Sequence, residues 1–256
     1  MRRHGRRPFT APLIAAALAA TGLAATGCDP AGLPAAGGGA GPVISARPTS
    51  KPPTSTPPTS TPAVARTASA ASAELVTIPV RVIAGRDPSY QRTAFGAAWS
   101  DAGSGVADAR NGCDTRNDVL KRDARPGTVH FKPGTRECKV TAGTWTSPYT
   151  GATLTRTSTI DIDHIVPLGR AWASGAKSWT ALRRLSFAND PDNLVAADRS
   201  SNRSKGDLGP SAWRPRRPYQ CAYAIRYVHS AKKWSLPISP SDVTALRDML
   251  GTCPAK

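Results

Sequence analysis

The chain has 256 residues, which is long enough for a leader, a linker and one compact domain. Its formal net charge is +17, because 34 lysine and arginine residues outnumber 17 aspartate and glutamate residues. A surplus of this size concentrates polyanions near the protein, so nucleic acid, an anionic membrane and an anionic cell-wall polymer are all candidate partners. The charge therefore selects a class of partner and does not indicate an activity.

The first 27 residues have the organisation of an export signal. Met1–Arg7 is basic, and the small, apolar run Pro12–Ala25 is short for a membrane span. Cys28 follows a small-residue site, as in the bacterial lipobox, although Ala25 stands where a larger aliphatic residue is usual. Two interpretations stay open, an ordinary cleaved leader and a lipoprotein signal with lipidation at Cys28. We favour the second, which predicts an exported protein anchored to the outer face of the cell membrane, with secretion as the alternative.

Residues 28–74 are predicted to form a disordered linker. They consist mostly of alanine, glycine, proline, serine and threonine, without the apolar periodicity that could offset the entropy of ordering. The proline content predicts a partly extended tether. We expect the folded domain to occupy residues 75–256.

The first half of this domain has mainly strand-like and short helical patterns. Residues 75–83 are rich in valine and isoleucine, which favours a strand or extended edge segment. The aromatic residues between 90 and 99 have helical spacing, and 111–123 also has a helical pattern. Residues 139–145 and 152–162 predict short strands on either side of a turn.

After Pro167 the pattern becomes helical, and two helices are predicted near the C-terminus, at residues 219–234 and 241–250. Strands come early and helices late, so we predict an α+β fold with few strands.

Four cysteines remain when Cys28 is set aside: Cys113, Cys138, Cys221 and Cys253. An even number suits two disulfides in an exported protein. A zinc site is the rival interpretation, but no two of these cysteines have C-x-x-C spacing. Among the three pairings that four cysteines allow, we favour Cys113–Cys138 and Cys221–Cys253, since each closes a moderate loop within one segment.

The stretch Asp161-Ile162-Asp163-His164 carries the first chemical signal. If it forms a strand, both carboxylates lie on one face, beside a histidine. Carboxylates suit hard cations such as Mg²⁺, and a neutral imidazole can deprotonate water. On its own, this stretch could equally be a solvated strand end.

Two later segments change that balance. Asp192-Asn193-Leu194 and Asn202-Arg203-Ser204-Lys205 follow Asp163-His164-Ile165-Val166-Pro167 in order. Together they resemble the HNH nuclease motif, D-H-I-x-P, then D-N-L, then N-x-x-K, within some forty residues. Asn202 stands at the third signature position in place of histidine, a variant that the family accepts. Over residues 90–253 the chain is also similar to exported actinobacterial HNH proteins with the DUF1524 (GmrSD C-terminal-like) domain, and residues 113–118 and 187–190 support this similarity.

The resemblance implies a ββα-metal (HNH) core with additional helices, in which a hairpin carries Asp163 and His164 and a helix carries Asn202. Asp163 and Asn202 would be ligands of a divalent metal, with Mg²⁺ favoured and Mn²⁺ or another divalent ion as alternatives. His164 would deprotonate the attacking water, and Asn193 would fix the loop that orients the imidazole. The implied activity is metal-dependent endonuclease cleavage of DNA, with RNA as an alternative, at low sequence specificity.

Basic residues near the motif are candidates for nucleic-acid binding. We predict that Arg199, Arg203 and Lys205 contact phosphate without reading sequence, with a solvated helix charge as the alternative for Lys205. No protein partner is predicted, and membrane contact is expected only through the lipid anchor. The main rival function is a non-catalytic basic envelope protein that binds nucleic acid or anionic polymer. A toxin or restriction component is a second rival.

Overall fold

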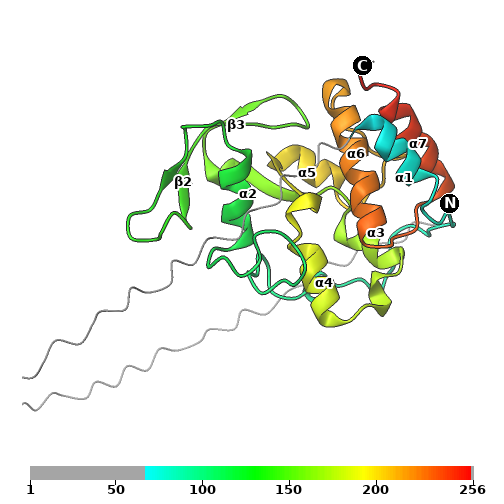
Figure 1. The fold of residues 1–256 in the computed structure, drawn as a ribbon, viewed down its shortest axis with the longest axis horizontal. Coiled ribbons are helices and arrows are strands. Elements are labelled where there is room, and N and C mark those ends of the chain that lie inside the picture. Colours follow the sequence, from blue (N-terminus) through cyan, green and yellow to red (C-terminus); the bar gives the residue numbers. More distant parts are fainter. Residues whose placement is uncertain (1–66, 255–256) are drawn as a thin grey trace, which may run out of the picture. The chain divides into compact units, whose positions relative to one another are not determined.

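The computed structural model describes residues 67–254 (Figure 1). The predicted export signal at 1–27, the lipidation site Cys28 and the linker as far as residue 66 lie outside the described residues. Within 67–254, no helix combines the length and the apolar character that crossing a membrane requires.

Helix α1 (Ala68–Leu75) opens the described part of the chain. The Thr67 side chain caps it by accepting a hydrogen bond from a backbone N–H of the first turn. Ala71 and Leu75 are buried in the main hydrophobic core. Helix α1 therefore lies within the range predicted as linker, because an alanine-rich helix with a narrow apolar face resembles a linker in composition.

Residues 75–83, predicted as a strand or an extended edge segment, form no regular strand. After α1 the chain turns and pairs only through an isolated parallel bridge between Val80 and Ile238. Val76, Val80 and Val82 in this segment are exposed, whereas Ile78 is buried in the main core. Figure 1 shows α1 beside α6 (Arg217–Lys233) and α7 (Pro240–Leu250), with which it packs.

The central sheet consists of two antiparallel strands, β5 (Ile160–His164) and β6 (Leu194–Asp198). Ile160 is opposite Asp198 and His164 is opposite Leu194. Helix α5 (Arg199–Lys205) follows β6 directly and packs against both strands. Asp198 caps this helix by accepting a hydrogen bond from the Ser201 N–H. Along the chain, these three elements therefore occur in the order strand, strand, helix.

Alternation along β5 gives the sheet two different faces. Ile160 and Ile162 are buried in a smaller hydrophobic cluster, together with Leu194 and Ala196 of β6. The opposite face carries the Asp161 and Asp163 carboxylates, as the sequence predicts. Both aspartates also contact residues of α5, through hydrogen bonds described below. The sheet therefore presents its carboxylates to the helix that follows it.

A helical insertion separates the two strands along the chain. It contains α3 (Leu168–Ala173), a 3₁₀ turn (Ala176–Ser178), α4 (Ala181–Ala188) and a second 3₁₀ turn, η4 (Pro191–Asn193). The last turn leads straight into β6, so the insertion returns the chain to the end of the strand that it left.

Short elements cover the smaller cluster. They are α2 (Thr115–Asp123), β1 (His130–Phe131), β2 (Val140–Ala142), β3 (Trp145–Thr146), β4 (Thr153–Leu154) and η2 (Thr157–Thr159). The 3₁₀ turn η1 (Arg92–Phe95) instead packs against α3 and α4, and its Phe95 is buried in the main core. The strands form two antiparallel ribbons, β1–β2 and β3–β4. A disulfide between Cys113 and Cys138 ties the segment before α2 to the first ribbon.

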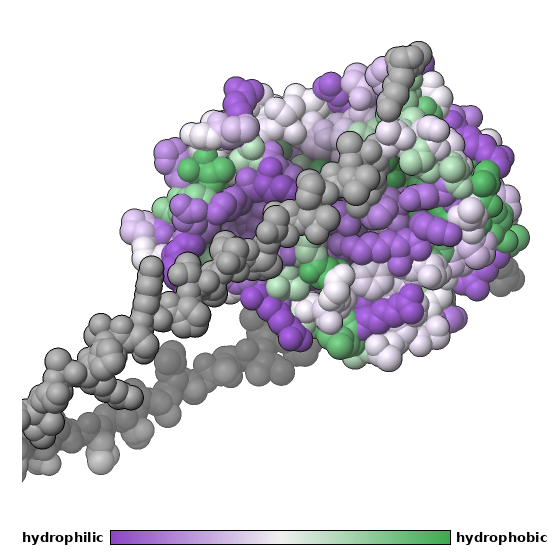
Figure 2. All heavy atoms as spheres, in the orientation of Figure 1, coloured by the Kyte–Doolittle hydropathy of each residue, from purple (hydrophilic) through white to green (hydrophobic). Residues whose placement is uncertain are grey.

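The C-terminal helices match the prediction to within two residues at each end. A second disulfide, Cys221–Cys253, joins α6 to the residues after α7. Both predicted pairings are therefore confirmed, as is the α+β class. On the face seen in Figure 2, hydrophilic residues predominate and hydrophobic ones are scattered between them.

Candidate active site

Asp163 lies near the end of β5 and is almost completely buried. The Tyr149 hydroxyl donates a hydrogen bond to its Oδ2, and the Lys205 Nζ lies 2.9 Å from the same oxygen. Burial and the neighbouring Asp163 raise the pKa of Tyr149 well above its ordinary value, so the phenol keeps its proton and remains a donor. The carboxylate is thus held from two sides.

Lys205, predicted to contact phosphate, has no exposed surface. Besides Asp163, its ammonium group bonds the backbone carbonyl of His164 at 2.7 Å. Burial lowers the pKa of Lys205, and the charge of Asp163 opposes that shift. Its ammonium group therefore binds groups in the protein interior. This burial agrees with neither of the two predicted roles, a phosphate contact or a solvated charge on the helix.

His164 follows Asp163 and is 5% exposed. Its Nε2 lies 2.9 Å from the carbonyl oxygen of Ala188, which can only accept, so Nε2 carries the proton and Nδ1 keeps a lone pair. The Trp99 indole stacks on the imidazole, with the ring centroids 6.0 Å apart and the planes 13° apart. Burial lowers the pKa of His164 to about 3, although the Ala188 hydrogen bond opposes this. At neutral pH the imidazole is therefore neutral, and its Nδ1 carries no proton.

Asn193, at the end of η4, is completely buried and contacts the backbone that follows His164. Its Oδ1 accepts from the Val166 N–H at 2.8 Å, and its Nδ2 donates to the Val166 carbonyl at 3.1 Å. The backbone carbonyl of Asn193 accepts a hydrogen bond from the Ile165 N–H at 2.7 Å, and the Ser230 hydroxyl of α6 donates to Asn193 Oδ1 at 3.0 Å. The side chain therefore fixes the position of the loop, and it does not line the polar cavity that contains His164.

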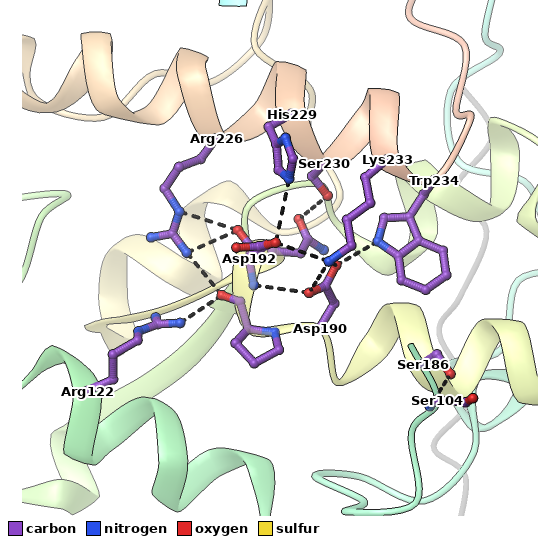
Figure 3. Close-up of polar contacts among 12 residues, drawn as sticks. Ser104, Arg122, Ser186, Asp190, Asp192, Arg226, His229, Ser230, Lys233 and Trp234 are labelled. Carbon is purple, nitrogen blue, oxygen red and sulfur yellow. Dashed lines mark hydrogen bonds and ion pairs between the residues drawn. The ribbon is translucent and has the colours of Figure 1, made fainter. Parts of the chain in front are cut away.

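Figure 3 shows that several charged side chains of α6 contact the loop that contains Asp190 and Asp192. Lys233 lies 2.9 Å from an Asp190 carboxylate oxygen, to which the Trp234 indole N–H also donates at 2.7 Å. Arg226 donates to the Leu194 carbonyl at 2.6 Å. The sequence motif gave no indication of this clamp, because its members lie more than thirty positions beyond the loop.

Asn202 projects from α5 towards β5. Its Nδ2 donates to Asp161 Oδ2 at 3.2 Å, and the Arg199 guanidinium pairs with the other Asp161 oxygen at 3.3 Å. Arg199 and Arg203 are both exposed. They are therefore accessible to a polyanion, as the predicted phosphate contacts require.

A polar cavity of about 170 Å³ brings three of the predicted residues together. Asp163, His164 and Asn202 line it. Arg92, from η1, and Asp207, after α5, line the same cavity and were not identified from the sequence. Arg92 carried no recognisable motif, whereas Asp207 lies just beyond the N-x-x-K segment, and that position was its only available signal.

The donors in this cavity fit a hard divalent ion in kind. Asp163 and Asp207 supply carboxylate oxygens and Asn202 an amide oxygen, and Mg²⁺ is usually bound by one or two carboxylates while keeping several waters. Asp163 would have to share its oxygens with Lys205 and Tyr149. Within residues 67–254 there is no group of three or more histidine, cysteine, aspartate or glutamate side chains arranged to hold a metal.

Residues 114–241 match the family model described as "GmrSD restriction endonucleases, C-terminal domain", and this range contains Asp163, His164, Asn193 and Asn202. A protein of Arthroderma benhamiae described as "Uncharacterized secreted protein" is 44% identical over 144 residues, which cover 55% of this chain and 68% of the relative. No solved structure matches.

Proposed function

Because the chain belongs to the family of GmrSD restriction endonuclease C-terminal domains, we propose that it is a metal-dependent endonuclease of the HNH type. The observation that carries this proposal is the polar cavity in which Asp163, His164 and Asn202 meet. Asp163 and His164 come from β5 and Asn202 comes from α5, and β5, β6 and α5 occur along the chain in the strand–strand–helix order of an HNH core.

In this proposal Asp163 and Asn202 hold a divalent ion, with Mg²⁺ favoured and Mn²⁺ as an alternative. When bound, such an ion stabilises negative charge that develops on the phosphate and on the leaving oxygen. Asp207 lies close enough to line the same cavity and can orient water. Tyr149 and Lys205 fix the Asp163 carboxylate, so that its free lone pairs face a constant direction.

His164 acts as the general base. Because the Ala188 carbonyl fixes the Nε2 proton, Nδ1 is the atom that takes a proton from the attacking water. Asn193 holds the backbone immediately after His164 and keeps the imidazole in place. Arg92 lines the cavity and neutralises the phosphate, while Arg199 and Arg203 attract the strand from the exposed side of α5.

We further propose that the enzyme works outside the cytoplasm. The two disulfides suit an oxidising compartment, and the Arthroderma benhamiae relative is described as secreted. Lipidation of Cys28 would hold the enzyme at the membrane surface. DNA with little sequence preference is the proposed substrate, and RNA is the alternative.

The test is cleavage of plasmid DNA by the full oxidised chain in Mg²⁺, Mn²⁺ or EDTA. We expect cutting that requires the ion and that falls about 10²–10⁴-fold in His164→Ala, the usual loss for a positioned general base. His130→Ala, which alters an exposed histidine on β1, is the matched control and should cut normally. Asn202→Ala, at a partly exposed position, should also lose cutting without loss of folding.

The rival function, a basic envelope protein that only binds polyanions, predicts a different pattern. If the parent and His164→Ala retard DNA equally, in a salt-dependent way, and neither cuts with any ion, the enzyme proposal fails. Thermal unfolding of each variant shows whether a loss of cutting reflects the site or the fold.

A further inference from the structure

A second cavity adjoins the polar one and has a different character. Its volume is about 310 Å³, and its lining is mainly apolar, including Phe95, Trp99 and Leu168. Arg92, His164 and Leu168 line both cavities, so the proposed base stands at the boundary between them. One side of His164 therefore faces carboxylates and the other an aromatic wall.

Trp99 is held in this wall in an unusual way. Its backbone φ is +58°, a left-handed conformation that a bulky side chain rarely adopts and that clusters at functional sites. The Trp99 carbonyl accepts a hydrogen bond from the Thr115 N–H at 3.2 Å, at the start of α2, and the indole lies parallel to the His164 ring. Trp99 is only partly buried, so its indole remains accessible to another flat ring.

The wall also contains a polar group without a partner. Asn189, which lines the apolar cavity, donates from Nδ2 to the Leu185 carbonyl at 2.9 Å, but its Oδ1 is buried and has no hydrogen-bond partner among the described residues. An unsatisfied acceptor favours a ligand that carries an N–H group.

A nucleotide has the same division of character as this pair of cavities, because a charged phosphate lies next to a flat base that carries N–H groups. We propose that the apolar cavity is a nucleobase subsite, which receives a base of the strand whose phosphate enters the polar cavity. This inference rests on the proposed nuclease function. A base must leave its stack to enter, so the preferred substrate is single-stranded or locally opened nucleic acid. Arg92 contacts the phosphate that links the two compartments.

Equilibrium binding in EDTA tests the subsite without any cleavage. The probes are a fluorescent oligothymidylate and an abasic strand with the same number of phosphates, measured by anisotropy with the full oxidised chain. Stacking of one base on an aromatic side chain contributes about 1–3 kcal/mol. Trp99→Leu should therefore weaken binding of oligothymidylate roughly 5- to 140-fold and leave the abasic strand unchanged. Trp99→Phe should keep most of the affinity.

Phe131→Leu is the matched control. Phe131 packs against the same small hydrophobic cluster as Trp99 but does not line the cavity. It should bind both strands as the parent does. Equal weakening of both strands by Trp99→Leu would overturn the subsite and assign Trp99 a structural role only, and so would unchanged binding of oligothymidylate. Because these measurements need no metal and no cutting, an inactive parent protein would refute the proposed function while leaving the base contact to be judged separately.

Discussion

Replacing Lys205 with methionine should destabilise the protein far more than an ordinary loss of a lysine. The Lys205 ammonium is fully buried, lies 2.9 Å from Asp163 Oδ2 and also bonds the His164 carbonyl. Lys205→Met keeps most of the side-chain volume. It leaves the buried Asp163 carboxylate with the hydrogen bond from Tyr149 but without the ammonium group that balances its charge. Breaking a buried ion pair by removing one partner typically costs about 3–5 kcal/mol.

Lys121→Met supplies the matched comparison. Lys121 pairs with Glu137 at 2.8 Å, nearly the same length, but the two side chains are 51% and 65% exposed. An exposed pair contributes about 0–1 kcal/mol. Urea unfolding of the oxidised protein at pH 7 gives the loss in free energy of unfolding for both variants. In thermal unfolding, a loss of 1 kcal/mol lowers the melting temperature of a domain of this size by about 2–4 °C, so Lys205→Met should lower it by about 6–20 °C.

The double variant Lys205→Met/Asp163→Asn isolates the pair. Since it removes both charges, it should be more stable than the sum of the two single losses predicts. Equal effects of Lys205→Met and Lys121→Met would refute the reasoning, because burial would then not decide the value of the bond. Additive losses in the double variant would show that Lys205 and Asp163 do not depend on each other.

Three further outcomes are expected from unfolding measurements. Burial alone would raise the pKa of Asp198, but hydrogen bonds from Ser201 and other donors lower it to about 2, so Asp198→Asn should cost about 1 kcal/mol above pH 4, and that difference should vanish as the pH falls from about 4 to 2. Burial raises the pKa of Asp118 to about 6, so Asp118→Asn should stabilise the protein by about 1 kcal/mol above pH 6, with the gain lost below about pH 4. Replacing Cys221 and Cys253 by serine opens a link across 32 positions and should cost about 2–4 kcal/mol, and an unchanged urea midpoint would contradict this.

The sequence predicted those features that depend on local spacing. Alternation placed Asp161 and Asp163 on one face of β5, and the loop lengths between cysteines led to the two disulfides that the structure contains. The two C-terminal helices have start residues and periodicity that are visible in the chain. Each of these inferences uses neighbours within one segment, where the geometry of a strand or helix limits the alternatives.

Other features depend on contacts that no local pattern encodes. Lys205 and Asp163 are 42 positions apart, so the sequence could not show that the lysine turns inward to pair with that carboxylate. Arg92 and Trp99 reach the cavities from a segment outside the motif. Strands β1 to β4 are only two or three residues long, too short for alternation to define them.

The charges around the polar cavity explain why a buried lysine fits the proposed chemistry. Asp163 and Asp207 bring two negative charges to it, and Lys205 and Arg92 bring two positive ones, so the set is formally balanced before substrate enters. A phosphodiester would then add an uncompensated negative charge in a confined, partly dehydrated space, which is costly. A divalent ion that bound together with the phosphate would change this net charge from negative to positive, so binding of the two together would be favourable. If Lys205 were absent, the charge of the ion would neutralise Asp163 instead. The cavity would then bind the metal tightly, but the metal would not improve binding of the phosphate. We therefore expect the parent to bind Mg²⁺ weakly alone and more tightly with a non-cleavable phosphodiester, and titration calorimetry showing equal Mg²⁺ affinity in both cases would contradict this charge balance.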